Sequence, residues 1–239
     1  MKVLELFSGT GSISKVCKEY GWDCISLDRD MKGKYKADIT EDIMTWDYTI
    51  FKPGEFDLIT ASPVCLFWSK LRFCNINQKR KDGTIFTREI LENDIEIYGK
   101  PMVDKIFEIL DYFKPSYWWI ENPKSSSMRN YINEDYYVVD YCMYGFKYKK
   151  PTRIWTNIKG FIPKECKQSC PSIISFTDRG GKPHNLHPLN NGGSTKCKML
   201  LKDYYEDNNI EPTSIHTSKF QRYRIPYQLI REFFDLIKN

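Results

Sequence analysis

The alternation of strand-like and helix-like segments is the feature that most constrains the fold of this chain. The apolar stretch KVLELFSG, residues 2–9, predicts a strand, and a helical pattern over 12–20 follows it. Short strands are expected over 24–30 and over 56–63, where FDLITASP ends at a proline. Strands and helices that alternate at these spacings are typical of an open α/β sheet with parallel strands.

The second half of the chain continues this pattern with one interruption. The expected elements are an amphipathic helix over 102–113, a buried strand over 116–123, two later strands over 136–146 and 152–157, and a helix over 227–237. Residues 158–213 are rich in Pro, Gly, Asn and Ser and predict a small irregular region. The charged segment 70–100 predicts a mobile, irregular loop.

A glycine-rich turn follows the first expected strand. LELFSGTGS places Gly9 and Gly11 between that strand and a helix, where backbone N–H groups can face a ligand. Ile13 replaces the third glycine of a dinucleotide fingerprint, which counts against NAD or FAD. Asp28, at the end of the second strand, is placed to accept ribose hydroxyls. The loop suits a nucleoside with an amino-acid tail; the alternative is a structural turn and a surface acid.

Three polar residues lie at or near strand ends, where open α/β sheets bind their ligands. Cys65 follows FDLITASPV, Glu121 ends the apolar run YWWI, and Arg153 begins the stretch RIWTN. Each residue taken alone also has a non-functional explanation. Cys65 could be an inert buried thiol, Glu121 an exposed strand end and Arg153 a surface charge. Together they suit attack of a thiolate on C6 of a pyrimidine, after which C5 takes a methyl group from a sulfonium donor. Glu121 would protonate N3, and a cation such as Arg153 would lower the pKa of the thiol.

These motifs resemble those of the C5-cytosine-specific DNA methyltransferases, which use S-adenosylmethionine. FSGTGS resembles the family's F-x-G-x-G motif, and LDRD the acidic motif after its second strand. SPVCLFWS resembles P-P-C-x-x-[FW]-S, WWIENP the E-N-V motif and KKPTRIW the Q-x-R-x-R motif; SKFQRYRIPYQLIREFF resembles the final motif, whose helix packs beside the first strand. The compact chain is most similar to short enzymes of large DNA viruses and phages. The resemblance implies a Rossmann-like methyltransferase sheet.

The resemblance also implies roles for individual residues. Cys65 would be the nucleophile, Glu121 would contact N3, and Arg153 would hold the base carbonyl or Glu121. The residues implied for S-adenosylmethionine are Phe7, Ser8, Gly9, Thr10, Gly11, Asp28, Pro63 and Asp42, with Asp38 as the alternative to Asp42 for the adenine amino group. The residues implied for the substrate are Ser69, Lys70, Arg72 and Asn122.

Three departures from the family pattern stand out. Val64 replaces the proline before the cysteine, Lys149 and Pro151 occupy the first two positions of the Q-x-R-x-R motif, and Pro123 follows Glu-Asn. Two alternatives to DNA methylation stay open here, and the departures favour the second of them. One is the same chemistry on RNA such as tRNA, and the other is a catalytically impaired DNA-binding relative.

Charge indicates a polyanionic partner, which we expect to be double-stranded DNA. The net charge is +5, and basic residues cluster over 70–88 and 144–153. The basic loop Lys70, Arg72, Lys79, Arg80 and Lys81 is expected to close over phosphates around a flipped base. Residues 1–157 with 214–239 would form the catalytic and cofactor-binding domain, and 158–213 the target-recognition region.

The cysteines and the N-terminus bear on the cellular compartment. The 8 cysteines are scattered, and no signal peptide or apolar stretch of membrane-spanning length is present, so we expect reduced thiols in an intracellular monomer, cytoplasmic or nuclear, possibly virus-encoded, and neither secreted nor bound to a membrane. Cys166, Cys170, His184 and His187 form a weak candidate zinc set, with Cys197 nearby. Free thiols and surface histidines are the main expectation for this segment.

Overall fold

The computed structural model describes residues 1–30, 35–80, 82–189, 195–210 and 218–238. Its strands are β1 (Lys2–Leu6), β2 (Asp23–Leu27), β3 (Leu58–Ala61), β4 (Tyr117–Pro123), β5 (Tyr136–Asp140), β6 (Pro151–Thr156), β7 (Ile174–Thr177) and β8 (Pro183–Leu186). Its α-helices are α1 (Ser12–Glu19), α2 (Arg88–Asp94), α3 (Lys100–Phe113), α4 (Thr195–Asp207), α5 (Lys219–Tyr223) and α6 (Tyr227–Ile237). None of the helices in these ranges has the length and apolar character that crossing a bilayer requires.

The main sheet has six strands in the order β2-β1-β3-β4-β6-β5. The first four are parallel, β6 runs antiparallel to β4, and β5 runs antiparallel to β6. The chain goes from β1 to β2 on one side and then crosses to β3 on the other, so the strand order reverses between β1 and β3. In open α/β sheets the ligand crevice lies beyond the carboxyl ends of the strands at such a reversal.

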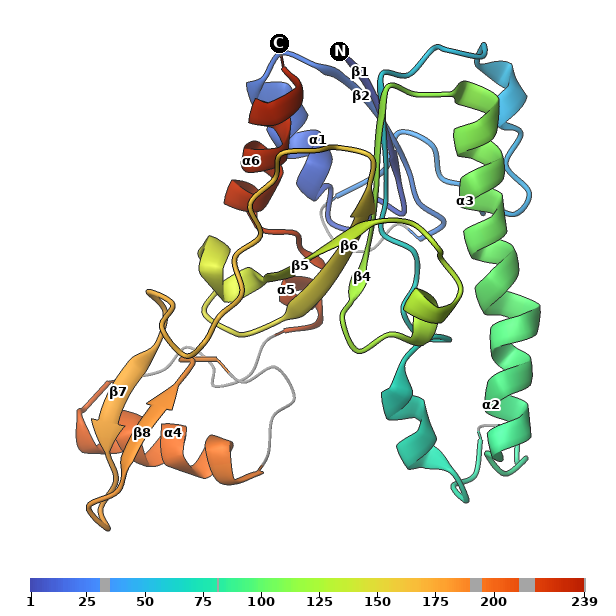
Figure 1. The fold of residues 1–239 in the computed structure, drawn as a ribbon. Helices are drawn as coiled ribbons and strands as arrows, with labels where there is room; N and C mark the ends of the chain where they lie inside the picture. The colour runs from blue at the N-terminus through green and yellow to red at the C-terminus, as the bar shows by residue number, and fades with distance from the viewer. Residues whose placement is uncertain (31–34, 81, 190–194, 211–217, 239) are drawn as a thin grey trace.

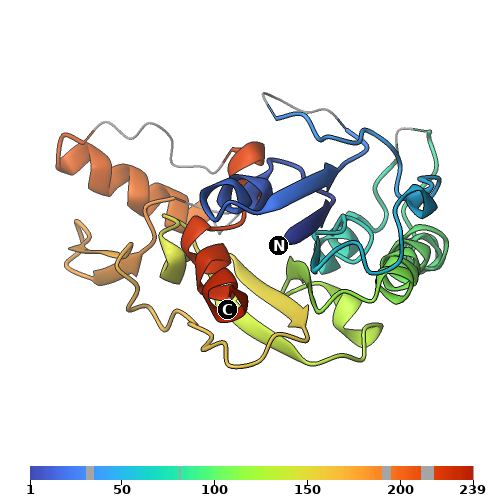
Figure 2. The same ribbon diagram turned by 90° about the horizontal axis from the view of Figure 1, so that it is seen from above.

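Helices cover both faces of this sheet (Figures 1 and 2). One face carries α1 and α6, whose apolar residues join Val3, Trp119 and Ile154 in one core cluster. The other carries α3, which packs on Leu4 and Ile120 in a second cluster. Neighbouring strand residues point to opposite faces, and this is why a strand buried on both faces reads as a continuous apolar run.

The expected α/β fold class is confirmed, and the expectation of parallel strands throughout is wrong for the last pair. β5 and β6 are joined by residues 141–150, which hold only the single 3₁₀ turn Tyr141–Tyr144. A parallel connection requires a crossover of a dozen or more residues, whereas antiparallel strands accept a short one. The last pair is therefore antiparallel.

Residues 70–100 are more helical than their charge indicates. A 3₁₀ helix spans Lys70–Asn75, and α2 continues through a π turn (Ile95–Gly99) directly into α3. The expected irregular loop is therefore wrong for residues 88–100. The buried Asp94 carboxylate pairs with the guanidinium groups of Arg72 and Arg80, which neutralises a charge that would otherwise oppose burial.

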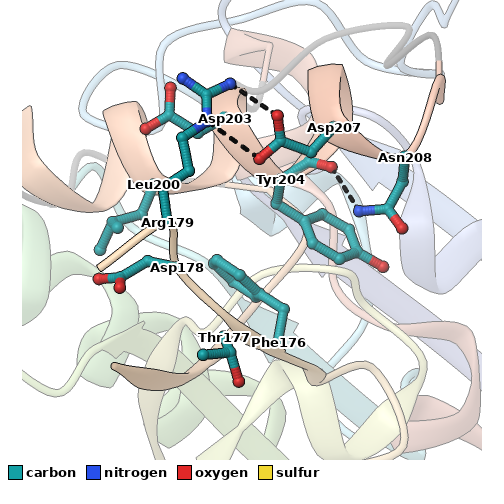
Figure 3. A pocket seen from close by; sticks show the side chains of 9 residues that line it. All are labelled: Phe176, Thr177, Asp178, Arg179, Leu200, Asp203, Tyr204, Asp207 and Asn208. Carbon is teal, nitrogen blue, oxygen red and sulfur yellow. Dashed lines mark hydrogen bonds and ion pairs between the residues drawn. The ribbon is translucent and has the colours of Figure 1, made fainter. Parts of the chain in front are cut away.

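Residues 174–207 contain a hairpin, β7–β8, and the helix α4, which form a lobe beside the main sheet (Figure 1). Figure 3 shows the shallow pocket between them. There the Arg179 guanidinium binds both Asp207 oxygens at 3.2 and 2.6 Å, and the Phe176 and Tyr204 rings lie 4.7 Å apart. The expected boundary of the target-recognition region at 213–214 lies outside the described residues.

Candidate active site

The turn after β1 is built from left-handed backbone conformations. Phe7, Gly9 and Gly11 have φ of 57°, 54° and 63°, a region that costs residues with a Cβ about 1 kcal/mol or more. A Cβ on Gly11 would lie 2.0 Å from the Tyr35 ring. Glycine is therefore required there both by the backbone conformation and by the lack of space for a side chain. The turn thus brings residues 8–11 to the carboxyl end of β1 and the N-terminus of α1.

Glu5, on β1, holds the start of α1. The N-cap residue of this helix, Gly11, offers no side chain, and the Glu5 carboxylate instead accepts the N–H groups of Ile13 at 3.2 Å and Ser14 at 3.0 Å, and the Ser14 hydroxyl. Burial raises the pKa of Glu5 to about 7, against these hydrogen bonds, which lower it. Sequence reasoning passed over Glu5, because an acid inside an apolar strand has no motif of its own.

We expect Glu5 to make the stability of the fold fall as pH rises. The folded-state pKa lies above the ordinary value of 4.5, so its contribution is fully present below pH 4.5 and is lost as pH rises through about 7, a difference of about 3 kcal/mol. Glu5→Gln should lose less stability than the wild type between pH 5 and 8, as measured by urea unfolding. Glu89→Gln, on the exposed surface, should follow the wild-type curve; parallel curves for Glu5→Gln would contradict this assignment.

The cofactor candidates meet around this turn. Asp28 accepts the Gly9 N–H at 2.8 Å through Oδ2 and the Asp30 N–H at 2.9 Å through Oδ1. The Ser8 hydroxyl oxygen is buried and has no hydrogen-bond partner among the described residues. An orphaned hydroxyl next to two left-handed glycines fits a turn that receives a polar ligand. Phe7 and Thr10 lie in the same turn.

The two alternatives for the adenine amino group differ in their contacts. Asp38 is held by β2, since its Oδ2 accepts the Ser26 N–H at 2.9 Å and the Ser26 hydroxyl at 2.6 Å. Asp42 instead caps its own turn through the Met44 N–H at 3.0 Å and pairs loosely with the exposed Arg29 at 3.3 Å. Asp42 is the freer carboxylate, which favours it over Asp38.

The turn that carries Cys65 follows β3 and is pinned to β4. Asn122 donates its Nδ2 to the carbonyl of buried Pro63 at 2.9 Å. The Asn122 Oδ1 has no hydrogen-bond partner among the described residues, which leaves an acceptor for a ligand. Val64 is 44% exposed, and its N–H has no acceptor among the described residues. A proline at this position would therefore remove no hydrogen bond. Cys65 itself is partly buried.

Glu121 lies in a buried cluster with a tyrosine and a lysine. Its Oε1 accepts the Tyr141 hydroxyl at 2.7 Å and lies 3.3 Å from the Lys150 ammonium. Lys150 also donates to the carbonyl of Arg222 at 3.1 Å and sits 4.7 Å from the Tyr141 ring centre. Burial and the Glu121 charge hold the pKa of Tyr141 well above its ordinary value, so its hydroxyl stays a donor.

The pKa of the Cys65 thiol is raised, which corrects the expectation that its surroundings lower it. Burial is the main cause and the Glu121 charge the second, while Lys150 acts in the opposite direction. The cation beside this site is therefore Lys150, which sequence reasoning missed. Its only signal was a basic residue between Lys149 and Pro151, the positions that the arginine motif occupies.

Arg153 lies on the opposite face of the sheet from Glu121. In the antiparallel register, Glu121 faces Ile154 and Asn122 faces Arg153, so Arg153 and Glu121 point to different faces. The Arg153 guanidinium lies 4.7 Å from the Tyr136 ring centre and donates to the Lys124 carbonyl at 3.3 Å. The expectation that Arg153 holds Glu121 is thus replaced by the Lys150 contact.

The basic loop is only partly open to a substrate. Arg72 and Arg80 are paired with Asp94, so they hold the 3₁₀ helix on α2. Ser69 caps that 3₁₀ helix by accepting the Leu71 N–H, and Lys70 is exposed. Lys79 is also exposed, and Lys81 lies outside the described residues. Of the expected phosphate contacts, Lys70 and Lys79 are therefore the available ones.

Replacing Lys150 should shift the pH dependence of any reaction that uses the Cys65 thiolate. Lys150 lowers the thiol pKa, so Lys150→Met should move the rising limb of the rate against pH to higher pH and cut the rate at pH 7 by about tenfold. Lys150→Arg should restore most of the loss, and Lys147→Met, an exposed lysine in the same connection, should change neither quantity. An unshifted profile for Lys150→Met would contradict this role.

Comparisons with known proteins show which proteins the chain resembles. No family model matches it. It is 37% identical over 242 residues, covering 99% of this chain and all of the relative, to a "Probable DNA (cytosine-5)-methyltransferase" of Frog virus 3 (isolate Goorha). Among solved structures, a mutant of Spodoptera frugiperda DNMT2 matches with 19% identity and a TM-score of 0.41, covering 69% of this chain and 53% of that one. WbdD bound to a kinase inhibitor matches with 11% identity and a TM-score of 0.37, covering 87% and 48%.

The full-length match to the Frog virus 3 protein has the level of identity at which relatives share a fold and a family. The residues that carry the motifs, from the glycine turn to Glu121, gather at one edge of the sheet, as a common site requires. The chain belongs to the DNA (cytosine-5)-methyltransferase family.

Proposed function

We propose that this protein transfers a methyl group from S-adenosylmethionine to C5 of cytosine in DNA through a covalent bond to Cys65. The observation that carries the proposal is the placement of the Cys65 turn beside the glycine turn, at the carboxyl ends of the adjacent strands β3 and β1. The Glu121 carboxylate comes from β4, the next strand along. The name of the Frog virus 3 relative supports the choice of DNA and of C5.

The chemistry divides a difficult alkylation into easier steps. The Cys65 thiolate forms a bond to C6, and the electron pair of the C5–C6 double bond moves through the ring toward N3. N3 takes a proton from Glu121, whose carboxylate takes up that proton from solvent when the base binds. Carbon C5 is then nucleophilic and accepts the methyl group, while the electron pair of the broken carbon–sulfur bond stays on the donor's sulfur, which leaves as a neutral thioether. A base removes the C5 proton, and the electron pair left on C5 re-forms the C5–C6 double bond. The thiolate leaves, and the proton on N3 returns. Tyr141 and Lys150 hold the Glu121 carboxyl in place throughout.

The glycine turn is where we place the cofactor. S-adenosylmethionine supplies an electrophilic methyl group on a sulfonium. Asp28 would bind the ribose hydroxyls, Asp42 the adenine amino group, and the orphaned Ser8 hydroxyl the amino-acid tail. Phe7, at the start of the turn, would stack on adenine.

The substrate is proposed to be duplex DNA bound by a monomer. C6 of a stacked cytosine is out of reach of a thiol, so the base has to leave the helix at a cost of a few kcal/mol. The hairpin lobe and the segment that holds the 3₁₀ helix and α2 lie on either side of the carboxyl ends of the strands (Figure 1). A duplex bound at this edge would contact both. Lys70 and Lys79 would contact phosphates. Cys65 forms no disulfide, as a thiol nucleophile requires.

The test is transfer of labelled methyl groups from S-adenosylmethionine to duplex DNA of mixed sequence, to tRNA and to DNA without cytosine. The proposal predicts label on duplex DNA alone, with bisulfite sequencing locating it at cytosines. Label on tRNA alone would move the same chemistry to RNA. No transfer to any substrate, combined with retained DNA binding, would make the chain an impaired DNA-binding relative and overturn the proposal.

A further inference from the structure

Three cysteines and one histidine from distant parts of the chain meet away from the active site. Cys142 lies in the 3₁₀ turn after β5, Cys166 and Cys170 lie in the segment after β6, and His187 follows β8 directly. One ligand atom from each lies within 4.8 Å of all the others. The three cysteines are buried and form a small cluster of their own with Met143 and Ile173 packed against it.

The spacing of these atoms matches a tetrahedral metal site. Zinc bonds of about 2.3 Å to sulfur and about 2.0 Å to nitrogen place sulfur and nitrogen about 3.6 Å apart and two sulfurs about 3.8 Å apart. The His187 Nε2 lies 3.3 Å from the Cys170 sulfur and 3.8 Å from the Cys166 sulfur. We propose that Cys142, Cys166, Cys170 and His187 bind one structural Zn²⁺.

This set corrects the weak candidate set drawn from the sequence. His184 is not a member, because its Nε2 pairs with Asp178 at 2.7 Å and its ring lies near Phe176. Cys142, which joins instead, is 24 positions before Cys166 and had no spacing signal. A disulfide is a poorer explanation of the cluster, since it would use two sulfurs and leave a buried thiol and an inward-facing imidazole without a purpose.

The turn between Cys166 and Cys170 is tight. Gln168 adopts a left-handed conformation with φ of 61°, which bends the Cys-x₃-Cys segment back on itself. This bend brings the two sulfurs into the same small buried cluster.

A second layer of contacts fixes the cluster to the main sheet. Asp140, the last residue of β5, accepts the Cys166 N–H at 2.6 Å, and Lys149 donates to the Cys166 carbonyl at 2.8 Å. Lys149 and Asp140 also pair at 3.3 Å. Lys149, which stands where the family motif has its glutamine, therefore serves the proposed metal site.

The site would fasten the hairpin lobe to the catalytic sheet. The hairpin has two strands of four residues, and an isolated two-stranded hairpin is at best marginally stable in water. Zinc binding would supply that stability, because it would join Cys142 beside the sheet, Cys166 and Cys170 in the segment before the hairpin, and His187 at the end of the hairpin. Cys142 directly follows Tyr141, whose hydroxyl binds Glu121, so the metal and the active site share one short segment.

The experiment is metal analysis of the full chain purified from medium with zinc and without chelators. We expect about one zinc per chain by mass spectrometry of the elements, and below about 0.2 for Cys170→Ser and His187→Ala. Cys74→Ser and His184→Ala are matched controls that should keep the metal. Wild-type protein below about 0.2 zinc after exposure to zinc, or full zinc in both ligand variants, would overturn the site.

A second measurement keeps the test valid if the ligand variants fail to fold. Wild-type protein exchanged into Co²⁺ should show the visible absorption of a tetrahedral thiolate site and sulfur-to-metal charge transfer. Chelation should then loosen the backbone so that trypsin cleaves after Lys167 and Arg179, which are already exposed, while β1 to β4 stay protected. A disulfide joining any two of the three cysteines in freshly purified wild-type protein, found by mass spectrometry, would overturn the proposal. None of these measurements depends on methyl transfer, so their outcome is independent of whether the proposed function is correct.

Discussion

Cys65→Ala should abolish methyl transfer, with a loss of at least about a thousandfold in the single-turnover rate. Alanine removes the sulfur that bonds to C6, and no other residue of the site can replace it, because Glu121 and Lys150 are committed to each other and to Tyr141 and Arg222. Cys65 is only partly buried, so the truncation leaves little cavity and the fold should persist. The rate is measured by rapid quench with labelled cofactor at saturating enzyme.

Two controls make this result specific. Cys74→Ser removes an exposed thiol nine residues later and should leave the rate unchanged. DNA with fluorine at C5 of the target cytosine cannot lose a proton from that carbon, so the wild type should remain bonded to it and Cys65→Ala should not. Transfer by Cys65→Ala within tenfold of the wild-type rate would rule out the covalent route.

Glu121→Gln is expected to give the second-largest loss, between about a hundredfold and ten-thousandfold in the rate of methyl transfer. Glutamine keeps the length and can still accept from Tyr141, but it cannot deliver a proton to N3 as the C6 bond forms. It also removes the charge that raises the pKa of Cys65. The thiolate should therefore form at lower pH while the overall rate falls, two effects of opposite sign.

The direction of the shift in the pKa of Cys65 separates a chemical role of Glu121 from a merely structural one. The reactivity of Cys65 toward iodoacetamide, followed against pH, should show its thiol titrating at lower pH in Glu121→Gln than in the wild type. Glu134→Gln, an exposed acid in the connection after β4, should change neither the titration nor methyl transfer. A Glu121→Gln enzyme that keeps a third or more of the wild-type rate would remove Glu121 from the mechanism.

The sequence was sufficient for most elements of the main sheet and for the edge at which the motif residues gather. Strands that end in a glycine turn, in Pro63 and in Glu121 can be recognised from local pattern, because a buried parallel strand is one continuous apolar run. The parallel order β1-β3-β4 then brings their carboxyl ends together. The helix after residue 224 packs against α1 as the family motif implies, and Ile225 donates its N–H to Ser12 at 3.1 Å.

The features that the sequence could not show depend on the direction of each strand and on the face of the sheet to which each side chain points. The face on which Arg153 lies follows from the register of an antiparallel pair, and a shift of one residue would reverse it. The position of Lys150 depends on a carbonyl at residue 222, and the cysteine cluster joins residues 142 and 187. Contacts over such separations are set by the topology of the whole chain and leave no periodic signal in any window.

The contact between Lys150 and the Arg222 carbonyl has a consequence for the timing of synthesis. The glycine turn, Cys65 and Glu121 all leave the ribosome within the first 121 residues, yet the lysine that contacts Glu121 is anchored by a segment made nearly last. Tyr148 is held in the same way by the Gln221 carbonyl at 2.6 Å. A growing chain therefore carries the proposed nucleophile long before it carries the anchor for Lys150, and the contacts around Glu121 are complete only once residue 222 is free to fold back.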